Sequence, residues 1–320
     1  DFLRDEVKPQ VVCLPNAMFI GMARAFREAL NVPVVCELTG EDIFLDAMKD
    51  QDREEVRRVI RARTADVARF VATSNYYADR MAEYLAVGRD QIDVVYTGIA
   101  EEYFSPAPAR GRRERPPTVG YLARICSEKG LGRLVEAMEI LVKLPGMSDV
   151  RVKVAGYLGG RDEKWFGALR KRIASSGLDS AFEYLGEVDR AAKLAMLDDI
   201  DVFSVPTAYP EAKGIYVLEA LARGVPVVQP AHGSFPELIE QTSGGILVPP
   251  GDAMALAHAL ADLLRDPNRR QQLGEAGRSA THSLFTEDHM AKNMLKVFEN
   301  VIAPNGGERL QPLSRLACPS

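Results

Sequence analysis

Two glutamates eight positions apart, Glu211 and Glu219, enclose the part of this chain whose residue types best suit chemistry. Gly214 lies between them, and a helical pattern begins at Tyr216. The start of a helix presents free N–H groups and the positive end of the helix dipole, which attract phosphate, and a glycine there lets the backbone come close. Carboxylates on either side can accept hydrogen bonds from hydroxyl groups. The pattern predicts a site for a sugar joined to a diphosphate, and the alternative is an exposed helix start with capping acids.

A second pair of charged residues, Arg124 and Lys129, follows the strand expected at 118–122. In open α/β sheets, ligands bind beyond the carboxyl ends of the strands. A bidentate guanidinium and a compact ammonium together suit a diphosphate. We therefore expect these two side chains to hold the diphosphate, and the alternative is that both are ordinary surface charges.

Strand and helix patterns alternate along the chain, which predicts an α/β fold with parallel, doubly wound sheets. A stretch rich in Pro and Arg at 107–117 breaks the periodicity and is expected to be a linker. It would separate an N-terminal Rossmann-like domain over 1–106 from a C-terminal one over 118–285. A helix over 286–303 should cross back to the first domain, and a disordered tail should follow over 304–320. The expected strands lie at 10–14, 33–38, 70–73, 93–96, 118–122, 150–155, 182–185, 201–205, 225–229 and 245–248.

The composition excludes several classes of protein. The 320 residues are 47% hydrophobic and 27% charged, which suits a globular protein of two domains. A net charge of −5 argues against broad nucleic-acid binding, and no apolar run is long enough to cross a membrane. The four cysteines form no Cys-x-x-Cys pair, which favours free thiols in a reducing compartment over a metal site or a disulfide framework.

Together these motifs resemble the donor site of the family 4 retaining glycosyltransferases, which have the GT-B fold of two facing Rossmann-like domains. The resemblance rests on the glutamate pair with Gly214 and on Arg124 and Lys129, with Ala123 where glycine is usual. Weaker similarity extends over roughly residues 10–300. Its clearest segments are 71–78, 94–106, 185–188, 236–239 and 244–252.

This resemblance implies a role for each matching residue. Arg124 and Lys129 would bind the diphosphate, and Glu211 would bind hydroxyl groups of the transferred sugar. These three are the expected catalytic residues. Glu219 would hold the ribose hydroxyls. The other residues expected to bind the donor, through the phosphate loop or the loop beside the nucleobase, are Gly186, Val188, Gly214, Ile215 and Tyr216.

The family implies a hexosyltransferase type of enzyme that moves a sugar from a nucleotide-diphosphate-sugar to an acceptor hydroxyl with retention of configuration. No cofactor is expected, and no Asp-x-Asp pair of the sequence is expected to bind a divalent metal. The acceptor would be a glycan, a lipid-linked molecule or a small molecule, and nucleic acid is not expected as a partner. The expected location is the cytoplasm, where peripheral contact with the inner membrane face is an option.

Three departures from the family pattern affect this interpretation. Lys213 stands where an aromatic residue is usual, and it could contact phosphate or acceptor, or point to solvent. Thr39 occupies the position where many members carry a histidine. The N-terminal domain is short. We therefore expect the family's first strand and its glycine-rich loop to be missing, and the chain to be a truncated form that lacks part of the acceptor side.

Two other functions stay open from the sequence. A nucleotide-sugar epimerase would share the architecture, but it needs acid and base groups on both sides of the cleft, and all four histidines lie at position 232 or beyond. A non-catalytic module that binds nucleotide-sugars is favoured by the short N-terminal domain and by Thr39. Product analysis without acceptor would identify an epimerase, and donor binding without turnover would identify a binding module.

Overall fold

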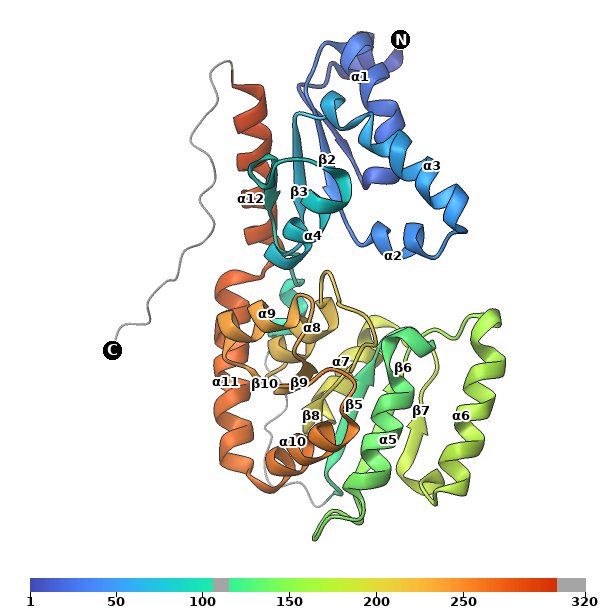
Figure 1. Cartoon of the computed structure of the whole chain (residues 1–320). Coiled ribbons are helices and arrows are strands. Elements are labelled where there is room, and N and C mark those ends of the chain that lie inside the picture. Colours follow the sequence, from blue (N-terminus) through green and yellow to red (C-terminus); the bar gives the residue numbers. More distant parts are fainter. Residues whose placement is uncertain (106–114, 304–320) are drawn as a thin grey trace. The chain divides into compact units, whose positions relative to one another are not determined.

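The computed structural model describes residues 1–105 and 115–303, which form two compact units (Figure 1). Unit 1 contains Asp1–Gly98 and the last helix from Asp288, and unit 2 is Ile99–Glu287. Most of the expected linker and the whole of the expected tail lie outside the described residues, so both stay predictions.

Unit 1 is built on a parallel sheet with the strand order β1-β2-β3-β4. Burial is nearly continuous along β2 and β3, as expected for strands that are covered on both faces. The strands are β1 (Val12–Leu14), β2 (Val34–Leu38), β3 (Arg69–Ala72) and β4 (Ile92–Val94). The helices, with short non-α segments labelled η, are η1 (Leu3–Val7), η2 (Ala17–Met22), α1 (Ala23–Leu30), α2 (Glu41–Asp46), α3 (Asp50–Arg61), η3 (Thr64–Asp66), α4 (Asn75–Leu85), η4 (Arg89–Gln91) and α12 (Glu287–Ile302).

The last helix, α12, completes the core of unit 1. Its Val297 is buried against Val35, Val71 and Val95, which come from β2, β3 and the end of β4. The apolar stripe of α12 packs around this contact through Met290, Met294, Phe298 and Val301. The C-terminal end of the described chain therefore belongs to the same core as its first strands.

Unit 2 is built on a parallel sheet with the strand order β10-β9-β8-β5-β6-β7. Counted from β5, this is the 3-2-1-4-5-6 order of Rossmann sheets, whose switch point lies between the first and fourth strands, here β5 and β8. Both sheets are parallel, as the alternating pattern predicts. The strands of unit 2 are β5 (Thr118–Leu122), β6 (Arg151–Ala155), β7 (Phe182–Tyr184), β8 (Val202–Phe203), β9 (Val227–Pro230) and β10 (Gly245–Val248).

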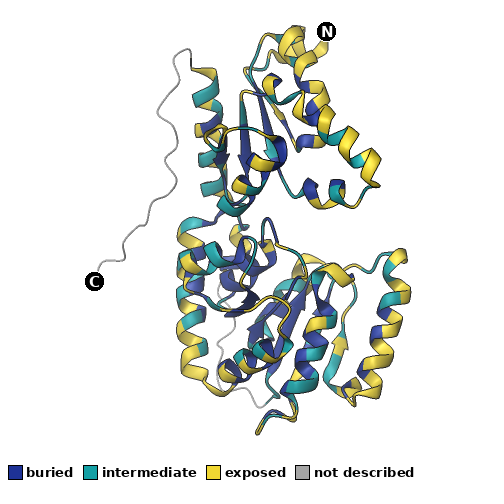
Figure 2. Ribbon diagram, in the orientation of Figure 1, coloured by how far each residue is buried: buried dark blue, intermediate teal, exposed yellow. Residues whose placement is uncertain are grey.

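Helices cover the buried strands of unit 2 and expose their outer faces (Figure 2). Glycines let α11 approach the end of α8 closely, since a Cβ on Gly274 would lie 2.3 Å from the carbonyl oxygen of Gly224. A Cβ on Gly277 would meet Leu221 in the same way. The helices and short segments are η5 (Glu101–Phe104), η6 (Ser127–Lys129), α5 (Leu131–Leu141), η7 (Gly160–Asp162), α6 (Glu163–Ser175), η8 (Asp179–Ala181), α7 (Arg190–Asp198), α8 (Ile215–Ala222), α9 (Phe235–Thr242), α10 (Ala253–Arg265) and α11 (Pro267–Leu284).

The segment Ile99–Ser105 lies in unit 2, whereas the sequence placed it in the N-terminal domain. Buried Arg223, held by Asp198, donates hydrogen bonds to the carbonyl oxygens of Tyr103 and Ser105 at 3.1 and 3.0 Å. Arg278 adds a hydrogen bond to the carbonyl of Phe104. These contacts come from residues more than a hundred positions away, so no local pattern could place the segment.

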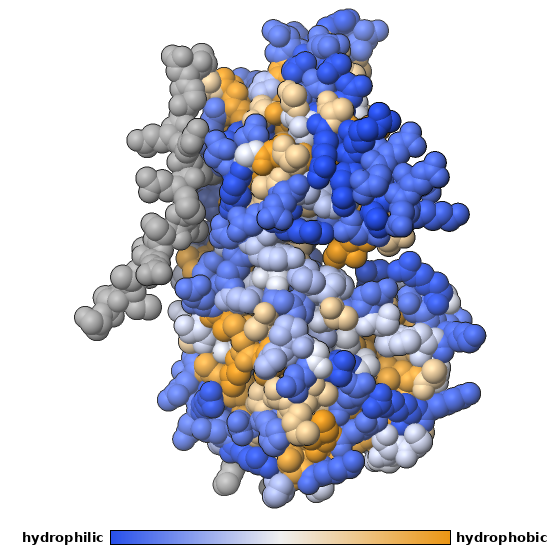
Figure 3. All heavy atoms as spheres, viewed as in Figure 1, coloured by the Kyte–Doolittle hydropathy of each residue, from blue (hydrophilic) through white to orange (hydrophobic). Residues whose placement is uncertain are grey.

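Most of the surface seen in Figure 3 is hydrophilic, with hydrophobic side chains in scattered patches. Within 1–105 and 115–303, none of the helices combines the length and the apolar character that a membrane span requires.

Candidate functional site

The charged residues singled out in the sequence lie at the switch point of the unit 2 sheet. Arg124 and Lys129 follow β5, and Glu211 follows β8, the strand next to it. The carboxyl ends of parallel strands meet at one edge, and the loops that leave β5 and β8 diverge there to form a ligand crevice. The topology therefore brings the predicted phosphate ligands and the predicted sugar ligand to one place.

Gly130 fixes the register between these two loops. Its φ is +77°, and a Cβ at this position would lie 1.8 Å from the carbonyl oxygen of Pro206. A backbone hydrogen bond of 2.9 Å joins the N–H of Ala208 to the carbonyl of Glu128 close by. The tight contact brings Lys129 next to the loop that carries Glu211.

The Lys129 ammonium donates to Oε2 of Glu211 at 2.5 Å. The hydroxyl of Tyr216 donates to the same carboxylate oxygen at 2.9 Å, and that of Tyr209 lies 3.4 Å from it. The side chains of Lys129 and Glu211 are only 12% and 11% exposed. The pair is thus nearly removed from water, where each charge depends on the other.

The polar contacts of Glu211 decide its charge state. Burial by itself raises the pKa of this carboxyl, but the charge and hydrogen bond of Lys129, the hydroxyl of Tyr216 and the N–H of Lys213 outweigh it and lower the pKa. Burial and the neighbouring Glu211 charge raise the pKa of Tyr216 well above its ordinary value. At neutral pH the site therefore holds an ionised carboxylate and a protonated tyrosine donor.

Two aromatic rings flank the Lys129 ammonium. Its Nζ lies 5.1 Å from the ring centre of Tyr209 and 5.3 Å from that of Tyr216, within the range of cation–π attraction. An ammonium carries three N–H groups, and the bond to Glu211 uses one of them. Lys129 can therefore hold Glu211 and still donate to an anion.

The helix α8 starts beside this pair. Gly214 caps it with φ +64°, a conformation that glycine adopts without strain, and Ile215 at its first position is 38% exposed. Behind Glu211, a Cβ on Gly233 would lie 2.4 Å from the backbone nitrogen of Glu211, and Ser234 donates its N–H to the carbonyl of Glu211 at 2.7 Å. The loop is fixed from behind, while the first N–H groups of α8 have no partner within the helix.

Arg124 is exposed, and its side chain has no hydrogen bond or ion pair with the described residues. Its backbone is tightly placed, because a Cβ on Gly156 would lie 1.7 Å from the carbonyl oxygen of Ala123. The guanidinium of Arg124 is thus fully available to a ligand, whereas one N–H of the Lys129 ammonium is already bound to Glu211.

The loop expected to border the nucleobase lies at the same edge of the sheet. Gly186 follows β7, and its carbonyl accepts a hydrogen bond of 2.8 Å from the N–H of Gly156, which follows β6. Val188 comes next, directly before Asp189, whose side chain caps α7. The structure therefore places Gly186 and Val188 two strands away from Arg124.

Glu219 lies one turn into α8 and has partners that the sequence did not suggest. Its Oε1 accepts hydrogen bonds of 2.7 Å from the hydroxyl of Tyr103 and from the ammonium of Lys193. Tyr103 belongs to η5 and Lys193 to α7, both within unit 2. No contact joins Glu219 to Glu211 or Lys129 among the described residues, so the two glutamates have separate surroundings.

His232 lies behind the same loop. Its Nε2 is 3.1 Å from the carbonyl oxygen of Thr207, which makes Nε2 the protonated nitrogen, and its Nδ1 is buried without a partner among the described residues. Burial lowers the pKa of His232 despite the charge of Glu211. The ring is therefore neutral at physiological pH and helps to hold the loop before Glu211.

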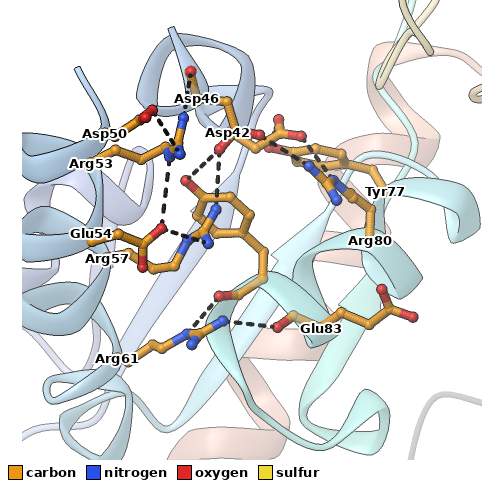
Figure 4. A network of polar contacts seen from close by, with 11 residues as sticks. Asp42, Asp46, Asp50, Arg53, Glu54, Arg57, Arg61, Tyr77, Arg80 and Glu83 are labelled. Atoms are coloured by element: carbon orange, nitrogen blue, oxygen red, sulfur yellow. Dashed lines mark hydrogen bonds and ion pairs between the residues drawn. The ribbon is translucent and has the colours of Figure 1, made fainter. Parts of the chain in front are cut away.

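Polar contacts in unit 1 hold the loop after β2, where Thr39 lies, and Figure 4 shows the adjoining network that links α2 with α3 and α4. Glu41 accepts the N–H groups of Ala17 at 2.9 Å and Thr39 at 2.7 Å, and Tyr77 donates to Asp42 at 2.9 Å. Arg80 in turn binds Asp42 and Asp46, which ties α4 to α2. The Thr39 backbone is thus held at the carboxyl edge of the unit 1 sheet.

Within the described part of the chain, no cluster of three or more His, Cys, Asp or Glu side chains has the arrangement of a metal site.

The structure joins Lys129, Glu211 and Tyr216 directly, and it places the other predicted residues along the same edge of the sheet. The sequence analysis missed Tyr209, Lys193 and Tyr103. Lys193 had one available signal, because it lies a turn after the loop that was expected to border the nucleobase.

Comparison with known proteins points to one family. A family model described as "Glycosyl transferases group 1" matches residues 107–280, more than half of the chain. A phosphatidyl-myo-inositol mannosyltransferase of Mycobacterium leprae is 31% identical over 231 residues, which cover 72% of this chain and 58% of the relative. A putative colanic acid biosynthesis glycosyltransferase, WcaL, of Escherichia coli K12 is 35% identical over 193 residues, which cover 59% of this chain and 45% of the relative. The chain thus spans about half the length of these curated relatives.

Solved structures agree on the fold. The Anabaena protein HepE, determined in complex with UDP, matches with a TM-score of 0.79 at 18% identity. The match covers 91% of this chain and 78% of HepE. Together with the parallel sheets described above, this likeness confirms the predicted α/β fold of the GT-B class.

Proposed function

Because the chain belongs to the group 1 glycosyltransferases, we propose that it transfers a sugar from a nucleotide-diphosphate-sugar to an acceptor hydroxyl with retention of configuration. We also propose that it is a family 4 enzyme of the hexosyltransferase type. The observation that carries the proposal is the nearly buried Lys129–Glu211 pair at the start of α8, on the switch point of the sheet.

The donor would lie across the carboxyl edge of the unit 2 sheet. Arg124, Lys129 and the first N–H groups of α8, at Gly214, Ile215 and Tyr216, would bind the diphosphate. The ionised Glu211 would accept hydrogen bonds from the sugar hydroxyls. At the other end, Glu219 would accept the ribose hydroxyls, and the loop containing Gly186 and Val188 would border the nucleobase.

In the transfer step, the bond between the anomeric carbon and the diphosphate oxygen breaks while the acceptor oxygen bonds to that carbon on the same face. The proton of the acceptor hydroxyl passes to the departing diphosphate oxygen. Negative charge grows on the diphosphate as the bond stretches, and Arg124, Lys129 and the helix N–H groups would stabilise it electrostatically. Positive side chains would thus take the place of a divalent metal, and no other cofactor is needed.

Two features bear on the acceptor and the setting. The names of the two curated relatives mention phosphatidyl-myo-inositol and colanic acid biosynthesis, and the acceptor that we propose is a lipid-linked molecule or a glycan. Cys13, Cys36 and Cys126 are free thiols, which fits the cytoplasm.

The two glutamates provide the test. Glu219→Gln should weaken binding of nucleoside diphosphates, because the ribose does not react and is held equally in ground and transition states. Glu211→Gln should lower turnover at saturating donor and leave nucleoside diphosphate binding nearly intact. Binding is measured by calorimetry on this chain, and turnover by release of nucleoside diphosphate.

Lys129→Ala and Arg124→Ala test the proposed phosphate contacts. Each should weaken diphosphate binding by about 1.5–3 kcal/mol, the scale of hydrogen bonds to charged groups. The loss should be smaller for the bare nucleoside. Equal losses for both ligands would contradict phosphate contact, and loss of nucleoside diphosphate binding in Glu211→Gln alone would reverse the assigned direction of the donor. Conversion of the donor to its epimer without acceptor would overturn transfer as the reaction.

A further inference from the structure

The two carboxylate oxygens of Glu219 have different surroundings. Oε1 accepts both the Tyr103 hydroxyl and the Lys193 ammonium, each at 2.7 Å. Oε2 accepts no hydrogen bond from the described residues, and it is not sealed from solvent. One oxygen is therefore occupied by the protein, and the other is available.

The carboxylate of Glu219 would be costly to bury alone, because its side chain is only 9% exposed. Lys193 supplies the opposite charge, and its ammonium is also 5.8 Å from the ring centre of Tyr103. Two donors that converge on one oxygen restrict rotation of the carboxylate about its last bond. The direction of Oε2 is thus set by two side chains from other elements.

We propose that Lys193 and Tyr103 are positioning residues that orient Glu219 to recognise a ribose, an inference that rests on the proposed nucleotide-sugar donor. The elements agree with it. Lys193 lies in the first turn of α7, immediately after the loop of Gly186 and Val188, so its bond to Glu219 links the nucleobase side of the site to α8. Tyr103 links the same carboxylate to η5.

The expected chemistry is recognition of a vicinal diol. A ribose offers two adjacent hydroxyl donors to a carboxylate, and a 2′-deoxyribose offers one. A fixed Oε2 distinguishes the two sugars, whereas a carboxylate that is free to rotate, or lacks its cation, distinguishes them less. The positioning residues should therefore change the preference for ribose more than the affinity for the diphosphate.

The experiment measures, by calorimetry on the whole 320-residue chain, the ratio of affinities for UDP over 2′-deoxy-UDP and for GDP over 2′-deoxy-GDP. The nucleotide pair that binds more tightly is used for the variants. The native chain should prefer the ribose form by about tenfold or more, the scale of a hydrogen bond to a charged group. Tyr103→Phe, which removes only a hydroxyl, should reduce this ratio at least about threefold, and Lys193→Met should bring it close to one.

Arg190→Met is the matched control, because Arg190 lies on the same helix and pairs with Glu102 of η5 without contacting Glu219. Arg190→Met should keep the native ratio of affinities. Lys193→Arg, which keeps a positive charge beside Glu219, should keep most of it. An unchanged ratio in both Tyr103→Phe and Lys193→Met overturns the inference, and so does a native chain that binds both sugars equally. If Lys193→Met does not fold, Tyr103→Phe decides.

Lys129→Ala separates the two proposals. Its loss of diphosphate affinity tests the proposed function, whether or not the ratio of affinities responds to changes at Tyr103 and Lys193.

Discussion

At the scale of single residues, the proposed donor site depends on carboxylates that are almost closed to water. Glu211 stays ionised because Lys129, Tyr216 and the N–H of Lys213 stabilise its charge more than burial penalises it. The same contacts couple the protonation of Glu211 to the stability of the fold.

The sign of this coupling gives a pH prediction. The pKa of Glu211 is lower in the folded chain than in the unfolded chain, so its contribution to stability is present above the ordinary glutamate pKa, about 4.3, and is lost as the pH falls through the folded value. The free energy of unfolding, measured by urea denaturation from about pH 6 to pH 3, should therefore fall less steeply in Glu211→Gln than in the native chain. Glu55→Gln, at an exposed position of α3, is the control and should keep the native slope. Equal slopes for Glu211→Gln and the native chain would contradict the ionised pair.

The sequence predicted the charged residues of the candidate site but not what holds them. Glu211, Lys129 and Arg124 were found because they lie close to strand ends and a helix start. Tyr103 and Lys193 were missed because their partner is 116 and 26 positions away, and only the sheet order brings them to Glu219. Side chains that act on a ligand directly leave a local pattern, whereas those that orient another side chain do not.

At the scale of elements, glycines set the distances between loops. Gly130 and Gly177 have nearly the same φ, +77° and +72°, but only Gly130 is pressed against a neighbour, the carbonyl of Pro206. The pair separates the effect of backbone strain from that of close approach.

Gly177→Ala should cost about 1–2 kcal/mol of stability, the strain of a left-handed conformation, and should not change nucleoside diphosphate affinity. Gly130→Ala should cost at least about 3 kcal/mol, because the added methyl group also collides with Pro206. It should weaken nucleoside diphosphate binding as well, since the loop that positions Lys129 must move. Thermal denaturation and calorimetry on both variants check this, and equal effects would mean that the contact at Pro206 does not position Lys129.

The elements themselves were predicted unevenly. Every expected strand exists, and the bounds of β5 and β10 are as predicted, because apolar runs between turn residues are a strong signal. Helices α3 and α11 are among those for which the sequence analysis gave no expectation. The first is rich in charged residues, with few apolar positions, and the second contains Gly274 and Gly277, which usually argue against a helix. In α11 those glycines serve close packing against α8 and Gly244, a tertiary requirement that overrides local preference.

At the scale of the whole molecule, each of the two units contains a helical segment that comes from the other part of the chain. The N-terminal part supplies η5 to unit 2, and the C-terminal part supplies α12 to unit 1. Where the two crossings meet, Ile99 donates its N–H to the carbonyl of Phe285 at 2.7 Å and accepts that of Glu287 at 3.2 Å. Each unit therefore contains residues from both parts of the chain.

Two separate polypeptides, 1–105 and 115–320, should consequently assemble when they are produced together. A tag on either one should copurify the other, because Arg223 and Arg278 hold η5 and the buried Val297 holds α12. Shortening the first polypeptide to 1–98, or the second to 115–287, should weaken the association. Failure of 1–105 and 115–320 to copurify, with both present in the soluble fraction, would contradict this exchange.

The position of Val297 in the core of unit 1 also has a consequence for synthesis of the chain on the ribosome. Val35, Val71 and Val95 are translated about 200 residues before their partner, roughly 10–40 s earlier at 5–20 residues per second. Unit 1 must therefore wait, with part of its apolar surface uncovered, until the whole of unit 2 has been translated. Nascent chains that are arrested with residue 287 outside the exit tunnel should be cleaved by protease within unit 1. Released chains that include residues 288–320 should resist this cleavage. Equal resistance of the two would mean that unit 1 closes its core without α12.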